Sequence, residues 1–232
     1  MHPLKIQSLS LQLPDGTMLC SELSFQIDPG EVLVLMGPSG SGKSTILSWL
    51  TGTLDKRIRA RGEVWLGDTR LTHLPVEQRR LGLMLQQDYL FPHMTVGENL
   101  KFGLRGGTRE SRNKKIIESL DDAGLSGMID RDPATLSGGQ RARVSLLRSL
   151  LSNPCALLLD EPFSRLDVRL REQIRAFTWR SAARLPTLLV THDGADVPDR
   201  AAILELHKHE TKSEHIEPPL PMAPAEQKLS DS

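Results

Sequence analysis

The sequence lacks any apolar run of about 18 residues, which is the length that a helix needs to cross a bilayer. Its first ten residues lack the continuous apolar core of a secretory signal. The only two cysteines, Cys20 and Cys155, have neither a metal-type nor a redox-type spacing, so we expect no disulfide framework and a reducing compartment. Aromatic residues make up only 4% of the chain. Because no apolar run is long enough to cross a bilayer, we expect any membrane role to come through a partner.

The chain also lacks a net charge, because 29 Lys and Arg residues balance 29 Asp and Glu residues. A neutral chain has no global basic field that collects nucleic acid or anionic lipid, so we expect no nucleic-acid partner. Arginines gather on one predicted helix, which has a buried stripe at Leu170, Ile174 and Phe177. We interpret this face as solvated. Its arginines are Arg165, Arg169, Arg171, Arg175, Arg180 and Arg184.

Several short apolar runs predict strands that are buried on both faces, as in parallel sheets. Helical patterns separate these runs, which favours an α/β fold with a mostly parallel sheet. The runs are Val32–Met36, Leu83–Leu85, Leu157–Leu159 and Thr187–Val190. Before them, Leu4–Leu13 and Leu23–Ile27 alternate around a turn at Pro14–Gly16, which predicts an N-terminal antiparallel β subdomain. The alternation slips at Ser8–Leu9, where we expect a bulge.

The stretch from about 90 to 150 shows no clear strand pattern. Two apolar stripes at helical spacing, one ending at Gly124 and one running from Val144 to Leu151, predict helices there. We therefore predict a helical subdomain at 90–150, inserted into one α/β domain over residues 1–210. Residues 211–232 are polar and contain four prolines, Pro218, Pro219, Pro221 and Pro224, so we expect a disordered tail.

The pattern G-x-x-x-x-G-K-[ST] at Gly37–Ser44 predicts a phosphate-binding loop. Its glycines let backbone N–H groups turn toward a polyphosphate, and the N-terminus of the next helix favours negative charge. Lys43 is expected to reach the β- and γ-phosphates, and Ser44 to ligate Mg²⁺. A glycine-rich turn without a ligand is the alternative, which the preceding buried strand and following helix disfavour. The expected contacts are Gly37, Pro38, Ser39, Gly40, Ser41, Gly42, Lys43, Ser44 and Thr45.

Two carboxylates, Asp160 and Glu161, end the apolar run at Leu157–Leu159. Alone they are a weak signal, since strands often end in an acidic helix cap. Together with a phosphate-binding loop they indicate phosphoryl transfer. We expect Asp160 to hold Mg²⁺, usually through water. Glu161, one residue further, is expected beside the γ-phosphate, where it polarises the attacking water.

The pentapeptide LSGGQ occupies Leu136–Gln140, ahead of a helical stripe. By itself it describes a loop that leads into a helix. With the phosphate-binding loop, the sequence resembles the ABC ATPases from residue 4 to about 206, because this pentapeptide is their signature. The resemblance implies a P-loop NTPase fold, ATP and Mg²⁺ as cofactors, and a head-to-tail homodimer with ATP between the subunits. Signature residues that would contact the ATP held by the partner are Ser137, Gly138, Gly139 and Gln140.

Further family motifs follow in the expected order. Gln86 matches the glutamine that senses Mg²⁺ and the attacking water, and His192 matches the switch histidine that contacts the γ-phosphate. Asp167 ends a segment that matches the D-loop, with Arg165 where many members have Ala. The resemblance thus implies catalytic roles for Glu161, His192 and Gln86. It implies nucleotide contact by Asp167 and metal contacts by Ser44, Gln86 and Asp160.

The segment Asp88–Asn99 resembles the importer branch that handles spermidine, iron, sulfate, sugars and thiamine. Asp132–Thr135 and Pro162–Asp167 are similar to a small, poorly characterised bacterial subgroup, sometimes described as thiamine-like uptake. The resemblance implies a peripheral ATPase at the cytoplasmic face of the inner (plasma) membrane, in a complex with a periplasmic solute-binding protein. An integral membrane permease subunit would dock near Asp88–Asn99, where Phe91 and Met94 belong to an apolar cluster.

Two features depart from the family pattern. No aromatic residue precedes Phe25, so Leu11 or Leu13 would pack on the base where the family stacks an aromatic ring, and we expect weak base discrimination. No glycine follows Ala201–Leu206, so we expect the terminal hairpin to be shortened or irregular.

Other classes of ABC ATPase fit less well. Members that act on DNA carry long coiled coils between the P-loop and the signature, and the linking segment here is too short. Ribosome-acting members carry two cassettes, and this chain has one. A non-hydrolysing structural subunit is disfavoured by intact Lys43, Asp160, Glu161 and His192. An exporter ATPase stays open within the transporter class.

Overall fold

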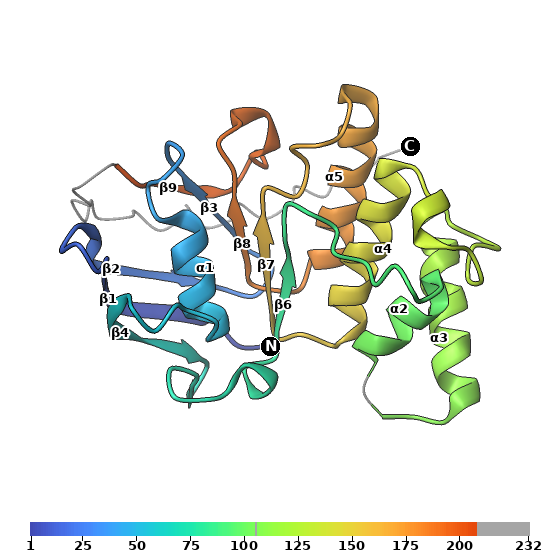
Figure 1. Ribbon diagram of the computed structural model, residues 1–232, viewed down its shortest axis with the longest axis horizontal. Helices are drawn as coiled ribbons and strands as arrows, with labels where there is room; N and C mark the ends of the chain where they lie inside the picture. The colour runs from blue at the N-terminus through green and yellow to red at the C-terminus, as the bar shows by residue number, and fades with distance from the viewer. Residues whose placement is uncertain (105, 208–232) are drawn as a thin grey trace, which may run out of the picture.

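The computed structural model describes residues 1–104 and 106–207. The expected tail at 211–232 lies outside these residues. Two sheets and a group of helices make up the described part, as Figure 1 shows. Among the described residues, no helix is long and apolar enough to cross a membrane.

An antiparallel sheet in the order β2-β1-β4-β5 forms one side of the molecule. Its strands are β1 (Leu4–Gln12), β2 (Met18–Ile27), β4 (Arg59–Leu66) and β5 (Thr69–Arg70). The pairing of β1 with β2 shifts between Ile6 and Leu9, and Ser8 has a φ of 49°. The predicted antiparallel pair and its bulge are therefore confirmed. The sequence pattern missed β4, because its first three residues are exposed and only its second half alternates.

A parallel sheet in the order β6-β7-β8-β3-β9 forms the centre. Its strands are β3 (Val32–Met36), β6 (Leu81–Met84), β7 (Ala156–Asp160), β8 (Thr187–Val190) and β9 (Ala202–Glu205). All residues of β8 and the first four of β7 are buried, as the continuous apolar runs predicted. Of the expected terminal hairpin, the described residues contain one strand, β9, which pairs parallel to β3. Residues 208 onward lie outside the described part.

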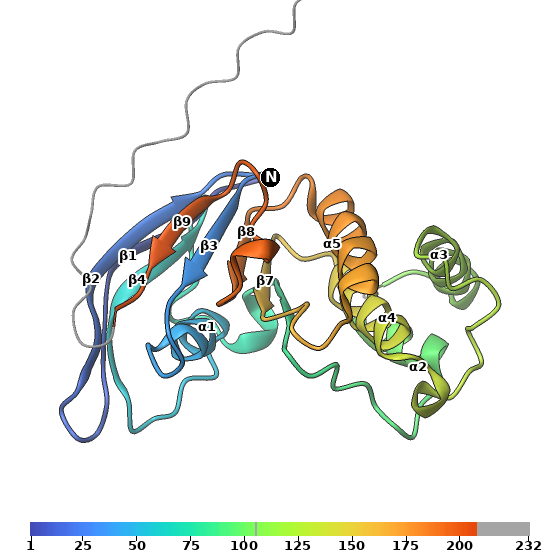
Figure 2. The same ribbon diagram turned by 90° about the horizontal axis from the view of Figure 1, so that it is seen from above.

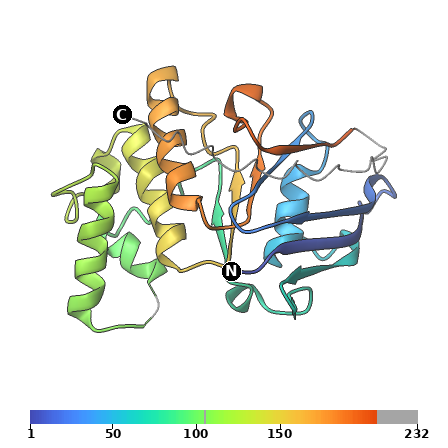
Figure 3. The same cartoon turned by 180° about the vertical axis from the view of Figure 1, so that it is seen from behind.

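Helix α1 (Lys43–Thr51) lies between the two sheets (Figure 2). Alternate residues of the parallel sheet face opposite sides, so Leu158 and Leu188 join the core around α1, whereas Leu157 and Leu189 join the core around the other helices. Those helices gather on the far side of the sheet (Figure 3). They are α2 (Val96–Gly103), α3 (Arg109–Asp122), α4 (Gly138–Leu151) and α5 (Val168–Ala182).

Short 3-10 turns complete the fold at η1 (Val76–Gln78), η2 (Pro133–Thr135) and η3 (Gly194–Asp196). Between residues 90 and 150, the described residues contain α2, α3, η2 and α4 and no strand. The helices predicted from the apolar stripes are present, and Gly124 follows α3 with a φ of 67°. The division into a separate helical subdomain stays a prediction.

The buried guanidinium of Arg79 fixes the carboxyl end of α1. Its side chain donates to the carbonyl oxygens of Trp49 at 2.8 Å, Leu50 at 2.6 Å, Leu74 at 2.9 Å and Thr72 at 3.0 Å. Arg79 is only 7% exposed. A cation at a helix C-terminus satisfies carbonyl groups that have no partner within the helix and complements the helix dipole. Arg79 therefore ties the carboxyl end of α1 to the segment that follows β5.

Replacing Arg79 with Met should lower the free energy of unfolding by about 3 kcal/mol, because several buried carbonyl groups lose their donor. Urea denaturation followed by circular dichroism measures this change. Arg59→Met, on the exposed start of β4, is the matched control and should change stability by less than about 0.5 kcal/mol. Equal stability of the two variants would contradict this role.

Candidate functional site

The loop between β3 and α1 turns sharply because it contains glycines. Gly37, Gly40 and Gly42 have φ values of 147°, 80° and 96°, a region that side-chain-bearing residues rarely adopt. A Cβ at Gly37 would collide with the carbonyl oxygen of Leu206, which immediately follows β9. Gly42 is the N-cap of α1 and provides no side-chain cap. The first-turn N–H groups of α1 therefore remain available to an anion.

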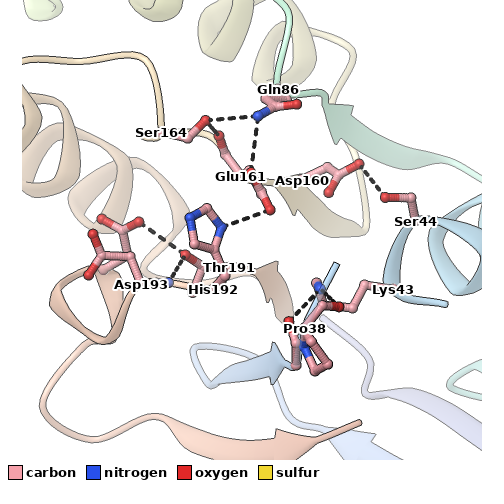
Figure 4. Close-up of polar contacts among 12 residues, drawn as sticks. Pro38, Lys43, Ser44, Gln86, Asp160, Glu161, Ser164, Thr191, His192 and Asp193 are labelled. Carbon is pink, nitrogen blue, oxygen red and sulfur yellow. Dashed lines mark hydrogen bonds and ion pairs between the residues drawn. The ribbon is translucent and has the colours of Figure 1, made fainter. Parts of the chain in front are cut away.

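Lys43 and Ser44 begin α1 beside this loop. The Lys43 ammonium donates to the carbonyl oxygens of Gly37 at 2.6 Å and Pro38 at 2.9 Å, so the lysine bridges its own loop. The Ser44 hydroxyl donates to Asp160 Oδ2 at 3.3 Å. A cation and a hydroxyl–carboxylate pair are thus placed at one helix N-terminus (Figure 4).

Glu161 follows the last residue of β7 with a φ of 45°, a conformation that costs about 1–3 kcal/mol for a residue with a side chain. Its backbone N–H donates to the Val190 carbonyl at 2.9 Å, and its carbonyl accepts from the Ser164 hydroxyl at 3.0 Å. Its carboxylate is held at both oxygens: Gln86 Nε2 donates to Oε2 at 3.0 Å, and His192 Nδ1 lies 2.9 Å from Oε1. Figure 4 shows Glu161 between these two side chains.

The carboxyl of Asp160 is set up to receive positive charge. The pKa of Asp160 is raised, chiefly by burial, and the charge of Glu161 adds to this rise. The hydrogen bond from Ser44 and the charge of Lys43 oppose it. A carboxylate that is partly desolvated beside another carboxylate gains most from a nearby cation. Ser44 and Asp160 offer two oxygen ligands, which suits Mg²⁺ because it keeps several waters and takes its other ligands from phosphates. The donor set therefore fits Mg²⁺.

These groups line a cavity of about 470 Å³. One end of the cavity is aliphatic, with Leu13 and Leu19, and the rest is polar. Of the two alternatives expected here, Leu13 lines the cavity, whereas Leu11 is fully buried in the core. Leu19 from β2 also lies at this end and was not predicted. The remaining lining residues are Ser39, Gly40, Gly42, Lys43, Ser44, Thr45, Gln86, Asp160 and Glu161.

The signature residues do not line this cavity. Ser137 caps α4, accepting from Gln140 N at 3.3 Å while Gln140 Oε1 accepts from Ser137 N at 2.9 Å. A Cβ at Gly139 would collide with the side chain of Leu170, so this glycine permits α4 to pack on α5. Asp167 likewise caps α5, accepting from Leu170 N at 3.0 Å. The structure thus brings the loop Gly37–Ser44, Asp160, Glu161 and Gln86 together, and His192 joins them through its contact with Glu161. Neither His192 nor Ser137–Gln140 nor Asp167 lines the cavity.

The segment that follows Gln86, including Tyr89 and Phe91, packs partly against α2 and α4. The Phe91 ring meets the Phe102 ring with centroids 4.9 Å apart, and the Arg148 guanidinium lies 5.4 Å from the Phe91 centroid. Arg148 also donates to the Tyr89 carbonyl at 2.9 Å. Tyr89 and Phe102, however, are 59% and 67% exposed. Phe102 was not singled out from the sequence, because its position on α2 gives it helical rather than loop context.

The expectation that the arginines of α5 form a solvated face is wrong for Arg171. Its guanidinium forms ion pairs with Asp193 and Asp196, each at 2.7 Å. The aspartates lie next to His192, in and beside η3. Sequence spacing could not reveal this contact, because the partners are more than twenty residues apart and belong to different elements.

Comparisons with known proteins point to the family that the sequence motifs resemble. The family model described as "ABC transporter" matches residues 20–164. An Escherichia coli (strain K12) protein, "Uncharacterized ABC transporter ATP-binding protein YnjD", is 44% identical over 204 residues, covering 87% of this chain and 94% of the relative. The "Putative 2-aminoethylphosphonate import ATP-binding protein PhnT" of Salmonella choleraesuis (strain SC-B67) is 38% identical over 216 residues, or 88% of this chain.

The chain covers 58% of the length of that import relative. Among solved structures, the "Dimeric Structure of MJ0796, a Bacterial ABC Transporter Cassette" aligns with a TM-score of 0.74 and 30% identity, over 90% of this chain and 96% of the other.

Proposed function

Because the chain belongs to the ABC transporter family as its ATP-binding subunit, we propose that two copies hydrolyse Mg²⁺-ATP at a shared interface and thereby power solute import through a separate permease. The observation that carries this proposal is the carboxylate of Glu161, held at both oxygens at the wall of the cavity. Gln86, His192 and Glu161 are the proposed catalytic residues.

The loop Gly37–Ser44, together with Thr45, is proposed to bind the phosphates of ATP. Residues of this loop and of the first turn of α1 line the cavity, and Lys43 would exchange its carbonyl partners Gly37 and Pro38 for phosphate oxygens. Ser44 and Asp160 would hold Mg²⁺, with Gln86 contacting it or its water. When bound, Mg²⁺ neutralises charge on the phosphate oxygens.

Glu161 is proposed as the general base. A carboxylate can only accept hydrogen bonds, so Gln86 donates to one oxygen and the Nδ1–H tautomer of His192 donates to the other. The remaining lone pairs of the carboxylate can accept a proton from a water beside the γ-phosphate. Two fixed donors keep the carboxylate in one orientation, which is the geometric requirement for proton abstraction. His192 would in addition present its other ring nitrogen toward the phosphate.

A second copy would complete the site. Ser137 accepts a hydrogen bond from Gln140 N within α4, and its hydroxyl proton remains free to be donated to a phosphate. The N–H groups of Gly138 and Gly139 add donors at the same helix N-terminus. Since these residues lie outside the cavity of their own chain, the ATP of a partner is the proposed ligand. The dimeric form of the related cassette supports this arrangement.

The permease is proposed to dock on an exposed aromatic surface made of Tyr89 and Phe102. Aromatic anchors suit a helix-in-groove contact, and Tyr89 lies shortly after Gln86 in the chain, so this part of the surface is close to the proposed nucleotide sensor. The name of the import relative supports import. The complex would sit at the cytoplasmic face of the inner membrane and include a periplasmic solute-binding protein.

Replacing Glu161 with Gln should reduce ATP turnover by about 10²–10⁴-fold, because the general base is lost. ATP affinity should remain, and an ATP-bound dimer should accumulate. Phosphate release and equilibrium dialysis measure the two properties. Lys43→Ala is the contrasting variant, since it should weaken nucleotide binding itself. Turnover by Glu161→Gln close to that of the wild type would refute the assignment.

The aliphatic end of the cavity leads to a second prediction. Stacking of a base on an aromatic ring contributes roughly 1–3 kcal/mol, and Leu13 and Leu19 provide none of it. GTP should therefore bind within about tenfold of ATP, because the phosphates and Mg²⁺ supply most of the affinity. Competition titration with a fluorescent ATP analogue measures this ratio. A preference for ATP of more than about a hundredfold would mean that another group recognises adenine.

The docking surface can be tested separately from the chemistry. Tyr89→Ala with Phe102→Ala should weaken permease association by about tenfold or more, while ATPase activity of the isolated chain stays within about twofold. Co-purification of the complex from membranes measures the association. Ile203→Ala, which removes another exposed apolar side chain on β9, is the control. Undiminished association of the double variant would place the docking site elsewhere.

The expectation that Phe91 and Met94 anchor the permease stays a prediction, and substituting Phe91 does not test it cleanly. Phe91 packs on Phe102 and Arg148, so Phe91→Ala would disturb the fold and the surface together. Tyr89 and Phe102 are largely exposed; because Phe102 also packs on Phe91, the single variant Tyr89→Ala gives the effect on the surface alone.

A further inference from the structure

Arg171 connects the start of α5 with the segment that carries His192. Its Nε donates to Asp196 Oδ1 at 2.7 Å, and its Nη2 lies 2.7 Å from Oδ2 of both Asp193 and Asp196. The hydrogen bond to Asp196 is the main cause of a raised Arg171 pKa. The Asp193 pKa is lowered, first by the Ala195 N–H and then by Arg171. One guanidinium therefore satisfies two carboxylates in the same short segment.

The aspartates in turn fix the backbone around His192. Asp196, which is 1% exposed, accepts from the Thr191 hydroxyl at 3.1 Å. The same hydroxyl accepts from Asp193 N at 3.1 Å (Figure 4). Asp193 also caps η3 through Ala195 N at 2.9 Å. Thr191 and Asp193, the residues on either side of His192, therefore belong to one hydrogen-bond network with Asp196 and Arg171.

His192 itself has little else to orient it. Its side chain is 60% exposed, and its contact with Glu161 depends on where the backbone of residues 191–193 lies. A buried carboxylate such as Asp196 is costly unless it is paired. Removing the guanidinium therefore leaves Asp196 without its cation, and the segment must rearrange toward water. Such a rearrangement would draw the imidazole away from Glu161.

We propose that Arg171 is a positioning residue, which orients His192 toward Glu161 by binding Asp193 and Asp196. It does not line the cavity and acts through His192. This inference rests on the proposed ATPase function for its kinetic consequence, but its structural consequence can be measured without ATP. Arg171 N donates to the Asp167 carbonyl at 2.8 Å, so the positioning contact begins one helical turn after the proposed partner-facing Asp167.

The first test is long-range ¹H–¹⁵N NMR of the histidine rings in the nucleotide-free, full-length chain. The chain has seven histidines, and loss of a signal in His192→Ala assigns the ring. Arg171→Met should shift the His192 Nδ1 resonance in the same direction as Glu161→Ala, because both changes remove the hydrogen bond between the ring and the Glu161 carboxylate. Arg180→Met, on the exposed part of the same helix, is the control and should leave the resonance unchanged.

The second test is steady-state kinetics. Arg171→Met should lower kcat by about 10–100-fold, since a misplaced catalytic group costs about that much, with KM for ATP within about twofold. Arg171→Lys, which keeps one ion pair, should recover part of the rate. Asp193→Asn removes one partner of Arg171 and keeps the acceptor for Ala195 N, so it should give a smaller effect of the same kind even if Arg171→Met does not fold.

The outcomes separate this inference from the proposed function. A wild-type chain without ATPase activity would refute the proposed function, while the NMR shifts would still decide the role of Arg171. An unchanged His192 resonance in folded Arg171→Met and in Asp193→Asn would overturn the positioning role. Equal loss of kcat in Arg180→Met would overturn it as well, because the effect would then belong to α5 as a whole.

Discussion

The contacts of Gln86 and His192 with the two oxygens of the Glu161 carboxylate are the interactions on which the rest of the site depends. Gln86 reaches it from the end of β6, and His192 reaches it from the end of β8. Glu161 itself follows β7, which lies between those two strands in the sheet. Three neighbouring parallel strands therefore deliver three side chains to one edge. Parallel sheets place ligand sites at the carboxyl ends of their strands for this reason.

The strain at Glu161 is consistent with this arrangement. A positive φ for a residue with a side chain persists only where the surroundings impose it, and here the Val190 carbonyl, the Ser164 hydroxyl and both carboxylate partners do so. The glycines of the phosphate-binding loop adopt positive φ without steric strain, because they have no Cβ. The site thus combines one strained residue, the proposed general base Glu161, with a glycine loop that reaches positive φ without steric strain.

Local patterns predicted four of the five strands of the parallel sheet, all but β9, and the bulge at Ser8. They succeeded because continuous apolar runs and fixed motif spacing are local properties. They missed β4, because its first residues are exposed and charged, and its pairing with β1 is a long-range contact. They also missed Leu19 at the cavity and misjudged Arg171, because a side chain's partners across the fold leave no mark in its own neighbourhood. The proposed roles of Ser137–Gln140 and Asp167 need a second chain, which one sequence cannot place.

The central claim is that one chain supplies the phosphate-binding loop and another supplies the signature. Mixing two inactive variants tests it most directly. Lys43→Ala removes the loop cation, and Ser137→Arg blocks the signature, so each homodimer lacks a complete site. In the mixed dimer, the intact loop of one chain faces the intact signature of the other. We expect little ATP hydrolysis by either variant alone and clear recovery on mixing. Full turnover by Ser137→Arg alone, or no gain on mixing, would contradict it.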